Sequence, residues 1–155
     1  MTGEVEIAEA GVPDLDAVMT VMNRAFDPSH GEAWTAPQCA GVLSLPGSLL
    51  LIARKAGKAL GFALVRSVAD EAELLLIAVR PDIQRSGVGL KLIEQVTGRL
   101  VQEGVKFLHL EVRSNNPALA FYERLGFGQI GLRRDYYRGI DGKLTDAITL
   151  SRQIG

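Results

Sequence analysis

The segment QRSGVG, residues 84–89, contains the residue types that most directly indicate ligand chemistry. It lies between the apolar run Leu74 to Val79 and a stretch whose apolar residues recur every three or four positions, as in an amphipathic helix. The first turn of a helix has unpaired backbone N–H groups and the positive end of the helix dipole, and glycine lets an anion approach them. The segment therefore predicts an anion site, although glycines at such turns are also common for steric reasons alone.

Two familiar phosphate-binding loops do not fit this segment. A Walker loop needs a lysine followed by serine or threonine directly after its glycines, and that pair is missing here. A dinucleotide fingerprint needs three glycines that open the first strand-helix unit of the chain. The predicted ligand is therefore a phosphate group of another kind.

The segments around this turn alternate between strand and helix patterns. The run 71–79, the following helix and the alternating run 105–113 predict a right-handed parallel crossover, whereas 49–53, 59–68 and 71–79 are separated by short turns that are typical of an antiparallel meander. We therefore expect an α/β (α+β) domain whose mixed, mostly antiparallel sheet has about six or seven strands and is flanked by about four helices. The other expected elements are strands at Val5–Ala8, 128–137 and 144–150, and helices at 14–26, after the Thr35 cap, and from Asn116-Pro117 to Leu125.

Composition excludes several classes of protein. The 155 residues are enough for one core, and 47% of them are hydrophobic and 23% charged, as in ordinary globular domains. The net charge of −1 does not favour nucleic-acid binding, and the apolar runs are shorter than the roughly 20 residues that span a bilayer. A single cysteine, Cys39, excludes an intrachain disulfide framework and a multi-cysteine metal site. We expect a cytoplasmic single domain over residues 1–155, a monomer or weak homodimer, that requires no metal.

Two motifs together resemble those of the Gcn5-related N-acetyltransferases (GNAT family). The segment 84–89 matches the Gln/Arg-x-x-Gly-x-Gly/Ala signature, and about 25 residues later SNNPALAFYERLGF matches the Asn-x₆-Tyr-x₃-Gly-Phe segment of that family. Within the family the chain most resembles the ribosomal-protein alanine N-acetyltransferases, through IAVRPDIQRSGVG, LHLEVRSNNPALAFYERLGF and RRDYYRGIDGKLTDAITL. The resemblance implies transfer of an acetyl group from acetyl-CoA to the α-amine of a protein N-terminus, by direct attack in a ternary complex.

The resemblance also implies roles for individual residues of this sequence. Glu111 matches the family's general base, and Tyr122 matches its general acid. We also expect Trp34, Tyr136 and Tyr137 to lie at the acceptor site. The cofactor would be bound by the backbone of Ile77, Ala78 and Val79 along pantetheine, by Arg85, Ser86, Gly87, Val88, Gly89 and Leu90 at the pyrophosphate, and by Asn115.

The chemistry of the two predicted catalytic groups suits this reaction. An α-amine with a pKa near 8 is mostly protonated at neutral pH, so a carboxylate such as Glu111 can remove its proton. The leaving thiolate resembles that of cysteine, with a pKa of about 8.5, and a phenol of pKa about 10 such as Tyr122 can stabilise or protonate it. A lysine amine, with a pKa of about 10.4, would be harder to neutralise.

Plainer interpretations of the same residues remain open at this stage. Glu111 could pair with Arg113 at the surface, and Tyr122 could be a packing residue of its helix. His109 reads as a half-buried strand residue and Cys39 as a core residue, which disfavours a second base and an acyl-cysteine intermediate. The tyrosine pair at 136–137 either covers the sheet or forms the wall of a peptide groove.

The acceptor is the least determined part of this reading. Between Glu111 and Asn115 the chain has one residue fewer than the relatives it resembles, and the loop FDPSHGEAW is longer than their matching stretch. A small-molecule amine or a lysine side chain is therefore an alternative acceptor, and a non-catalytic acyl-CoA-binding module is an alternative function.

Overall fold

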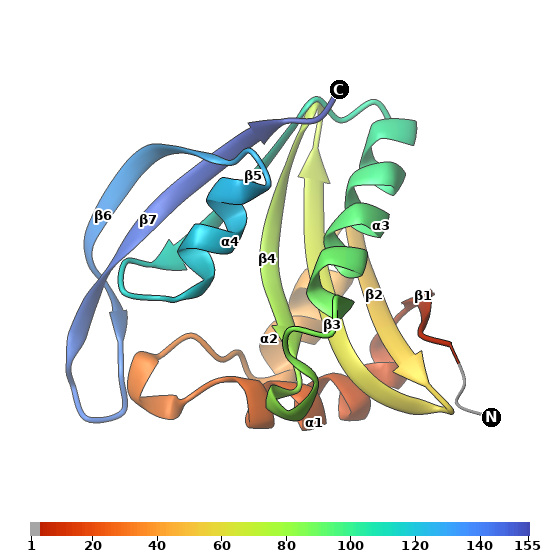
Figure 1. The fold of residues 1–155 in the computed structure, drawn as a ribbon, viewed down its shortest axis with the longest axis horizontal. Helices are drawn as coiled ribbons and strands as arrows, with labels where there is room; N and C mark the ends of the chain where they lie inside the picture. Colours follow the sequence, from red (N-terminus) through yellow and green to blue (C-terminus); the bar gives the residue numbers. More distant parts are fainter. Residues whose placement is uncertain (1–3) are drawn as a thin grey trace.

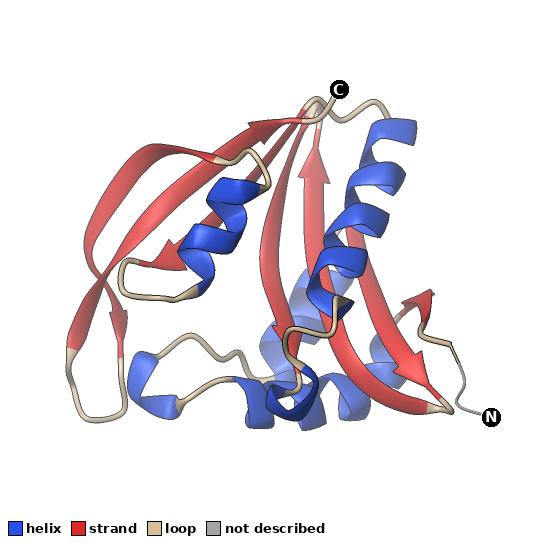
Figure 2. Ribbon diagram, in the orientation of Figure 1, coloured by secondary structure: helices blue, strands red, loops and turns tan. Residues whose placement is uncertain are grey.

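The computed structural model describes residues 4–155, which form one seven-stranded mixed sheet with helices on both of its faces (Figures 1 and 2). The strand order is β1-β2-β3-β4-β5-β7-β6, and only the β4–β5 pair is parallel. The strands are β1 (Glu6–Ala10), β2 (Ser48–Lys55), β3 (Lys58–Val68), β4 (Glu71–Val79), β5 (Phe107–Arg113), β6 (Gly128–Arg138) and β7 (Leu144–Gln153).

The predicted helices are present and begin where the sequence signals placed them. Thr35 and Gln38 form the expected capping box, in which each side chain accepts a hydrogen bond from the backbone N–H of the other, at 3.3 and 2.8 Å. The α-helices are α1 (Leu15–Ala25), α2 (Ala36–Leu43), α3 (Val88–Gln102) and α4 (Ala118–Arg124), and three short 3-10 turns are η1 (Val12–Asp14), η2 (Pro28–His30) and η3 (Pro81–Ile83).

The core is divided by the sheet into two hydrophobic clusters. Leu49 and Leu51 of β2 pack with the buried face of α3, whereas Leu50 and Ile52 pack with α1 and α2 on the other face. Side chains alternate across a strand, so a run that is apolar at every position marks a strand covered on both sides. The continuous apolar segment 49–53 therefore lies in the interior of the sheet, next to β1 and β3.

The expected meander and crossover are confirmed, while several strand ends differ from the prediction by one to three residues, as β7 and β1 illustrate. β2, β3 and β4 are antiparallel neighbours, and β5 follows α3 to pair parallel with β4. β7 extends to Gln153 rather than Leu150, because Gln153 pairs with Phe107 at the start of β5. β1 runs to Ala10 rather than Ala8, because Ala10 still pairs with Leu50. The polar residues at these strand ends belong to the strands through backbone pairing alone. The alternation of apolar residues therefore did not predict them.

We predict that Leu92→Ala lowers the free energy of unfolding by about 2–5 kcal/mol, because Leu92 is fully buried where α3 packs on the sheet. Val101 lies on the same helix with 43% of its surface exposed. Val101→Ala is therefore the control, and it should change the free energy of unfolding by no more than about 0.5 kcal/mol. Urea denaturation of both variants tests this, and equal losses would contradict the described packing of α3.

Candidate active site

The site forms where β4 and β5 stop pairing. Their parallel register runs only from Glu71 with Phe107 to Leu74 with Leu110. Beyond that point the two strands diverge, and the sheet opens into a V whose arms carry α3 on one side and α4 on the other (Figure 1). The edge of β4 that faces β5 therefore has no strand partner from residue 75 to residue 79.

A β-bulge in β4 accompanies this opening. Leu64 of β3 pairs with Leu76 and Val65 pairs with Leu74, so Leu75 is an extra residue in β4. An extra residue shifts the alternation of side chains by one position. Leu74 accordingly packs with the α3 cluster, Leu75 and Leu76 both turn to the α1–α2 cluster, and Ile77 returns to the α3 side.

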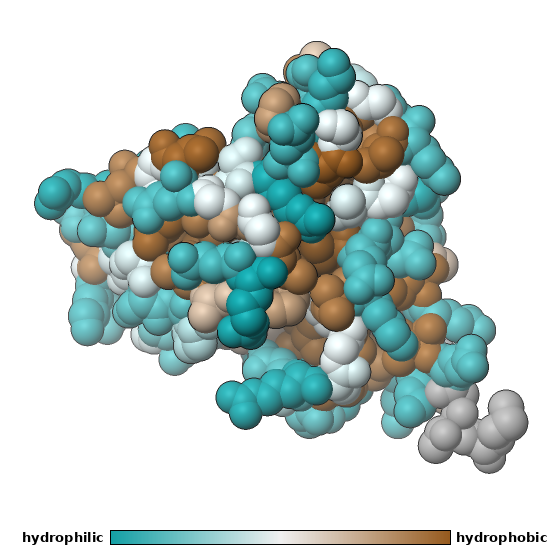
Figure 3. Space-filling model, turned by 45° about the horizontal axis from the view of Figure 1, so that its top comes forward, coloured by the Kyte–Doolittle hydropathy of each residue, from teal (hydrophilic) through white to brown (hydrophobic). Residues whose placement is uncertain are grey.

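One cavity, the donor groove, runs from the free edge of β4 past the start of α3 to α4. Its volume of about 700 Å³ is large enough for an extended ligand. Apolar surface extends across the middle of the face shown in Figure 3, interrupted by polar side chains. The donor groove is lined by Ile77, Ala78, Val79, Ile83, Gln84, Arg85, Gly87, Val88, Gly89, Leu90, Asn116, Pro117, Ala118, Phe121, Tyr122 and Arg124.

The start of α3 supplies the anion-binding end of the donor groove. Gly87 precedes the helix with φ +89°, a conformation that side chains with a Cβ rarely adopt, and no side chain caps the helix. The N–H groups of the first turn are thus available to a ligand. Arg85 is exposed beside them, so positive charge and free donors meet where the sequence predicted them. Ser86, in contrast, donates its hydroxyl hydrogen to the Ile83 carbonyl.

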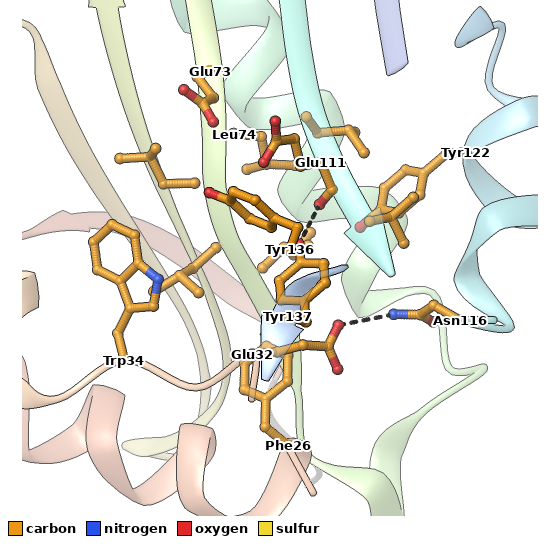
Figure 4. A pocket seen from close by; sticks show the side chains of 15 residues that line it. Phe26, Glu32, Trp34, Glu73, Leu74, Glu111, Asn116, Tyr122, Tyr136 and Tyr137 are labelled. Carbon is orange, nitrogen blue, oxygen red and sulfur yellow. Dashed lines mark hydrogen bonds between the residues drawn. The ribbon is translucent and has the colours of Figure 1, made fainter. Parts of the chain in front are cut away.

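A second cavity, the acceptor cavity, lies on the other side of the V and has a volume of about 340 Å³ (Figure 4). Its walls are the end of α1 and the following loop, β4, β5 and the irregular part of β6. Aromatic rings and carboxylates predominate among its side chains. The lining comprises Phe26, Glu32, Trp34, Glu73, Leu74, Leu75, Leu76, Ile77, Leu110, Glu111, Val112, Asn116, Tyr122, Tyr136 and Tyr137.

The two cavities share three lining residues, which are Ile77, Asn116 and Tyr122. Ile77 comes from the free edge of β4, and the other two come from the start and the middle of the segment 116–124. A ligand in the donor groove and a ligand in the acceptor cavity would therefore meet beside the Tyr122 ring. This arrangement suits the transfer of a group from one to the other.

Tyr122 is 7% exposed and is held by aromatic packing. Its ring makes edge-to-face contacts with Phe121 and Phe127, at centroid distances of 5.5 and 5.9 Å. Burial raises the pKa of the Tyr122 hydroxyl far above its usual value, and the negative charge of Glu32 raises it further. The hydroxyl therefore stays protonated at neutral pH and can act as a hydrogen-bond donor.

Two carboxylates from adjacent strands lie together at the inner end of the acceptor cavity (Figure 4). Glu111 forms an ion pair with Arg133, at 2.8 Å from Oε1 to Nε, and accepts a hydrogen bond from the Thr149 hydroxyl at 3.4 Å. Desolvation at the cavity wall raises the pKa of the Glu73 carboxyl, and the neighbouring Glu111 adds to this effect. The surface pairing of Glu111 with Arg113 that the sequence left open is not present.

The loop after α1 is fixed at the cavity by a buried ion pair. Arg113 donates from Nε to Glu32 at 3.2 Å, and the two side chains are 9% and 12% exposed. Asn116 donates a further hydrogen bond to Glu32 at 3.4 Å (Figure 4). Gly31 has φ +68°, and a Cβ there would lie 2.0 Å from the Arg138 carbonyl oxygen, so this position requires glycine. The loop is therefore tied to both β5 and β6.

The predicted acceptor residues Trp34, Tyr136 and Tyr137 all line the acceptor cavity. β6 is irregular here, since Arg133 pairs with Ala147 and Tyr137 pairs with Thr145. The extra residues bring the two tyrosine rings edge to face at 5.1 Å, and the Tyr137 hydroxyl donates to the Glu111 carbonyl at 3.5 Å.

Asn115 and Asn116 have different positions. The Asn115 side chain is exposed and accepts a hydrogen bond from Arg113 at 2.6 Å, whereas Asn116 lines both cavities. The connection from β5 to α4 is a tight turn in which the Asn116 N–H donates to the Arg113 carbonyl. Asn116 also accepts the Ala118 N–H at 2.8 Å and so caps α4. This turn follows the stretch between Glu111 and Asn115 that is one residue shorter than in the relatives that the sequence resembles.

Sequence reasoning missed Glu32, Glu73 and Asn116 as cavity residues. Glu32 belongs to the unusually long loop that the sequence had indicated, and Asn116 is adjacent to the predicted Asn115. Glu73 had a weaker signal, since it is one of two glutamates at the start of an otherwise apolar strand.

His109 and Cys39 lie where their predicted packing roles require. His109 is 3.2 Å from Glu71 and stacks on Phe107, away from the lining of both cavities. Cys39 is 1% exposed in the α1–α2 cluster, and burial raises the pKa of its thiol. Between residues 4 and 155, no helix is sufficiently long and apolar to span a membrane.

Comparison with known proteins gives consistent matches. Residues 15–127 match the model of the Acetyltransferase (GNAT) family. The chain is 46% identical over 99 residues to the [ribosomal protein bS18]-alanine N-acetyltransferase of Escherichia coli, an alignment that covers 63% of this chain and 66% of that protein, slightly less than two thirds. It is 37% identical over 118 residues to N-alpha-acetyltransferase RimI of Mycobacterium tuberculosis, with 73% and 71% covered.

Solved structures extend the match over almost the whole fold. The crystal structure of the ribosomal-protein-S18-alanine N-acetyltransferase from E. coli superposes with a TM-score of 0.88 at 37% identity, covering 98% of this chain and 95% of that one. Ard1 from Thermoplasma volcanium gives a TM-score of 0.84 at 25% identity, with 97% and 98% covered. The divergent β4–β5 pair, the glycine-led helix and these matches lead to one conclusion: the chain belongs to the GNAT family of acetyltransferases.

Proposed function

We propose that this protein is an acetyl-CoA-dependent N-acetyltransferase that acetylates the α-amine of a protein N-terminus. The observation that carries the proposal is the meeting of the donor groove and the acceptor cavity at Tyr122. Glu111 and Glu73 in the acceptor cavity attract an ammonium group, and the start of α3 suits a pyrophosphate. We further propose the N-terminal alanine of a ribosomal protein as acceptor, since the E. coli relatives are named for that substrate.

The donor groove fits acetyl-CoA in the distribution of its polar groups. The first-turn N–H groups of α3 and Arg85 would hold the pyrophosphate. The free edge of β4 from Ile77 to Val79 would pair with the amide groups of pantetheine, since it has no strand partner there. Asn116 faces the groove where Asn115 was expected, and we propose that it takes the cofactor contact.

The proposed reaction assigns one proton step to each catalytic residue. Acetyl-CoA supplies a thioester carbon that is open to attack by an amine. Glu111 accepts a proton from the acceptor's ammonium group, which leaves a neutral nitrogen to form the new C–N bond as the C–S bond breaks. Tyr122 donates its hydroxyl hydrogen to the sulfur, which leaves as a thiol. The second proton of the attacking nitrogen then returns to the Tyr122 oxygen, and Glu111 releases its proton to solvent, so that the neutral amide and both residues are restored. The hydrophobic packing of Tyr122 keeps this donor neutral and fixed.

The α-amine is a better acceptor for this cavity than a lysine. Removing a proton from a group with a pKa near 8 costs less at neutral pH than removing one from a group with a pKa near 10.4. Trp34, Tyr136 and Tyr137 line the cavity and give it aromatic surface against which a chain terminus can pack (Figure 4).

We predict that the protein acetylates a basic peptide that begins with alanine, at the α-amine only. Mass spectrometry of the product locates the acetyl group, and a peptide with a blocked N-terminus but a free lysine is the control. Thiol release with small amines but not with the peptide would favour the small-molecule alternative. Tight acetyl-CoA binding without transfer to any amine would favour a binding module.

We predict that Tyr122→Phe lowers kcat by about 10²- to 10⁴-fold, the usual contribution of a general acid. The dissociation constant for acetyl-CoA should change less than about threefold, because the ring that packs on Phe121 and Phe127 is kept. Calorimetry and steady-state rates measure the two quantities. A variant with native turnover would remove Tyr122 from the mechanism.

We predict that Gly87→Val weakens acetyl-CoA binding by about tenfold or more, because the left-handed conformation costs a residue with a Cβ about 1–2 kcal/mol. Gly98 lies in the same helix, has φ outside the left-handed region and has open space around it, so Gly98→Ala is the control. It should leave the dissociation constant unchanged. Equal affinities for the two variants would mean that the start of α3 does not hold the cofactor.

A further inference from the structure

Glu111, the proposed proton acceptor, already has a cation bound to it. The Nε atom of Arg133 lies 2.8 Å from Oε1 of Glu111, a residue that lines the acceptor cavity. The two partners differ in exposure, since the Glu111 side chain is 12% exposed and the Arg133 side chain is 60% exposed. Because the Arg133 guanidinium is exposed, it stays in water when the ion pair breaks. Breaking the pair therefore costs little free energy.

The side chains at the acceptor cavity carry more negative charge than positive charge. Glu73 and Glu111 both face Arg133, and Glu73 has no ion-pair partner of its own among residues 4–155. Glu32 is neutralised separately by Arg113 at 3.2 Å. The two strand carboxylates and the single guanidinium thus leave one negative charge uncompensated, which a cationic acceptor would balance.

Arg133 also has a second contact that would remain if it left Glu111. Its guanidinium carbon lies 5.2 Å from the centroid of the Tyr136 ring, within cation–π distance. The backbone that carries it is irregular, since three residues of β6, 134–136, lie between pairs that are separated by only Asp146 on β7. Asp135 in this bulge has φ +53°. The side chain can therefore turn toward Tyr136 without breaking a regular strand pair.

We propose that Arg133 is a displaceable substitute for the acceptor's ammonium group at Glu111. This inference rests on the proposed function and specifies how its acceptor binds. The ammonium group replaces the guanidinium, and Glu111 then accepts one proton from it, which leaves the neutral amine that attacks. Glu111 releases that proton to solvent. The amide product has no charge on its nitrogen, so Arg133 returns to the ionised Glu111 and the product binds the cavity more weakly.

The test compares Arg133→Gln with Arg134→Gln. Arg134 is the adjacent residue, is exposed, and makes no ion pair within residues 4–155, so both variants lose one positive charge from the same segment. The first readout is the NMR chemical shift of the Glu111 side-chain carboxyl carbon at neutral pH, with and without peptide, which needs no turnover. The groups that face Glu111 and Glu73 are His109 of β5, Arg133, Tyr136 and Tyr137 of β6, and Glu32 of the loop after α1.

Loss of Arg133 should change the chemical shift of the Glu111 carboxyl carbon, because the carboxylate loses its ion-pair partner. Arg134→Gln should leave that chemical shift at its native position. In the native protein, saturation with an alanine-initiated peptide should move the Arg133 Nε–H signal, because the ammonium group replaces the guanidinium at Glu111.

The second readout is product inhibition. In Arg133→Gln the unacetylated peptide should bind at least about tenfold more tightly, and the inhibition constant of the acetylated peptide should fall, because nothing competes with either for Glu111. Weaker peptide binding by Arg133→Gln, or a Glu111 carboxyl chemical shift in Arg133→Gln equal to that in Arg134→Gln, would overturn the proposal. If the native protein acetylates no peptide, the proposed function fails, whereas the response of Glu111 to Arg133 and to the added peptide still decides the inference.

Discussion

The separation of β4 from β5 is the feature on which the rest of the structure depends. Backbone pairing ends at Leu74 and Leu110, and each later residue of β4 has one edge free. Such an edge is costly inside a protein unless a ligand pairs with it, so the fold provides the strand that a cofactor can complete. The separation also opens a passage through the sheet, at which Tyr122 of one arm lies between the two cavities.

The bulge at Leu75 connects this opening with the packing of the core. By shifting the alternation of side chains, it lets one strand keep Leu74 under α3 while Glu73 faces the acceptor cavity and Ile77 faces the donor groove. A regular strand would place Ile77 on the same face as Glu73. The chemistry of both cavities thus depends on one additional residue in β4, where the hydrophobic core is otherwise continuous.

Much of the fold and of the candidate site could be predicted from the sequence. Each feature that could not be predicted has an identifiable physical reason. Periodicity and capping residues placed the helices and the meander, because apolar spacing and cap chemistry are local properties. The residues Glu111, Tyr122, Tyr136 and Tyr137 were identified through family motifs and lie around one cavity. The roles of Asn115 and Asn116 were not separable, since a single turn decides which side chain faces the groove. The position of the Glu32 side chain depends on its ion pair with Arg113, 81 positions away, and no local sequence pattern reveals such a pair.

The loop after α1 is anchored at few points, so its sequence can change during evolution more freely than that of the strands. Gly31 fits against β6, and Glu32 reaches Arg113 and Asn116. The donor groove contains no residue of that loop. The wall that chooses the acceptor can therefore be lengthened or exchanged with little effect on the donor half, provided that Gly31 and Glu32 keep these anchors. Such a division lets a lineage keep one activated metabolite while it acquires new targets, and it gives protein engineers a short segment with defined anchors to graft.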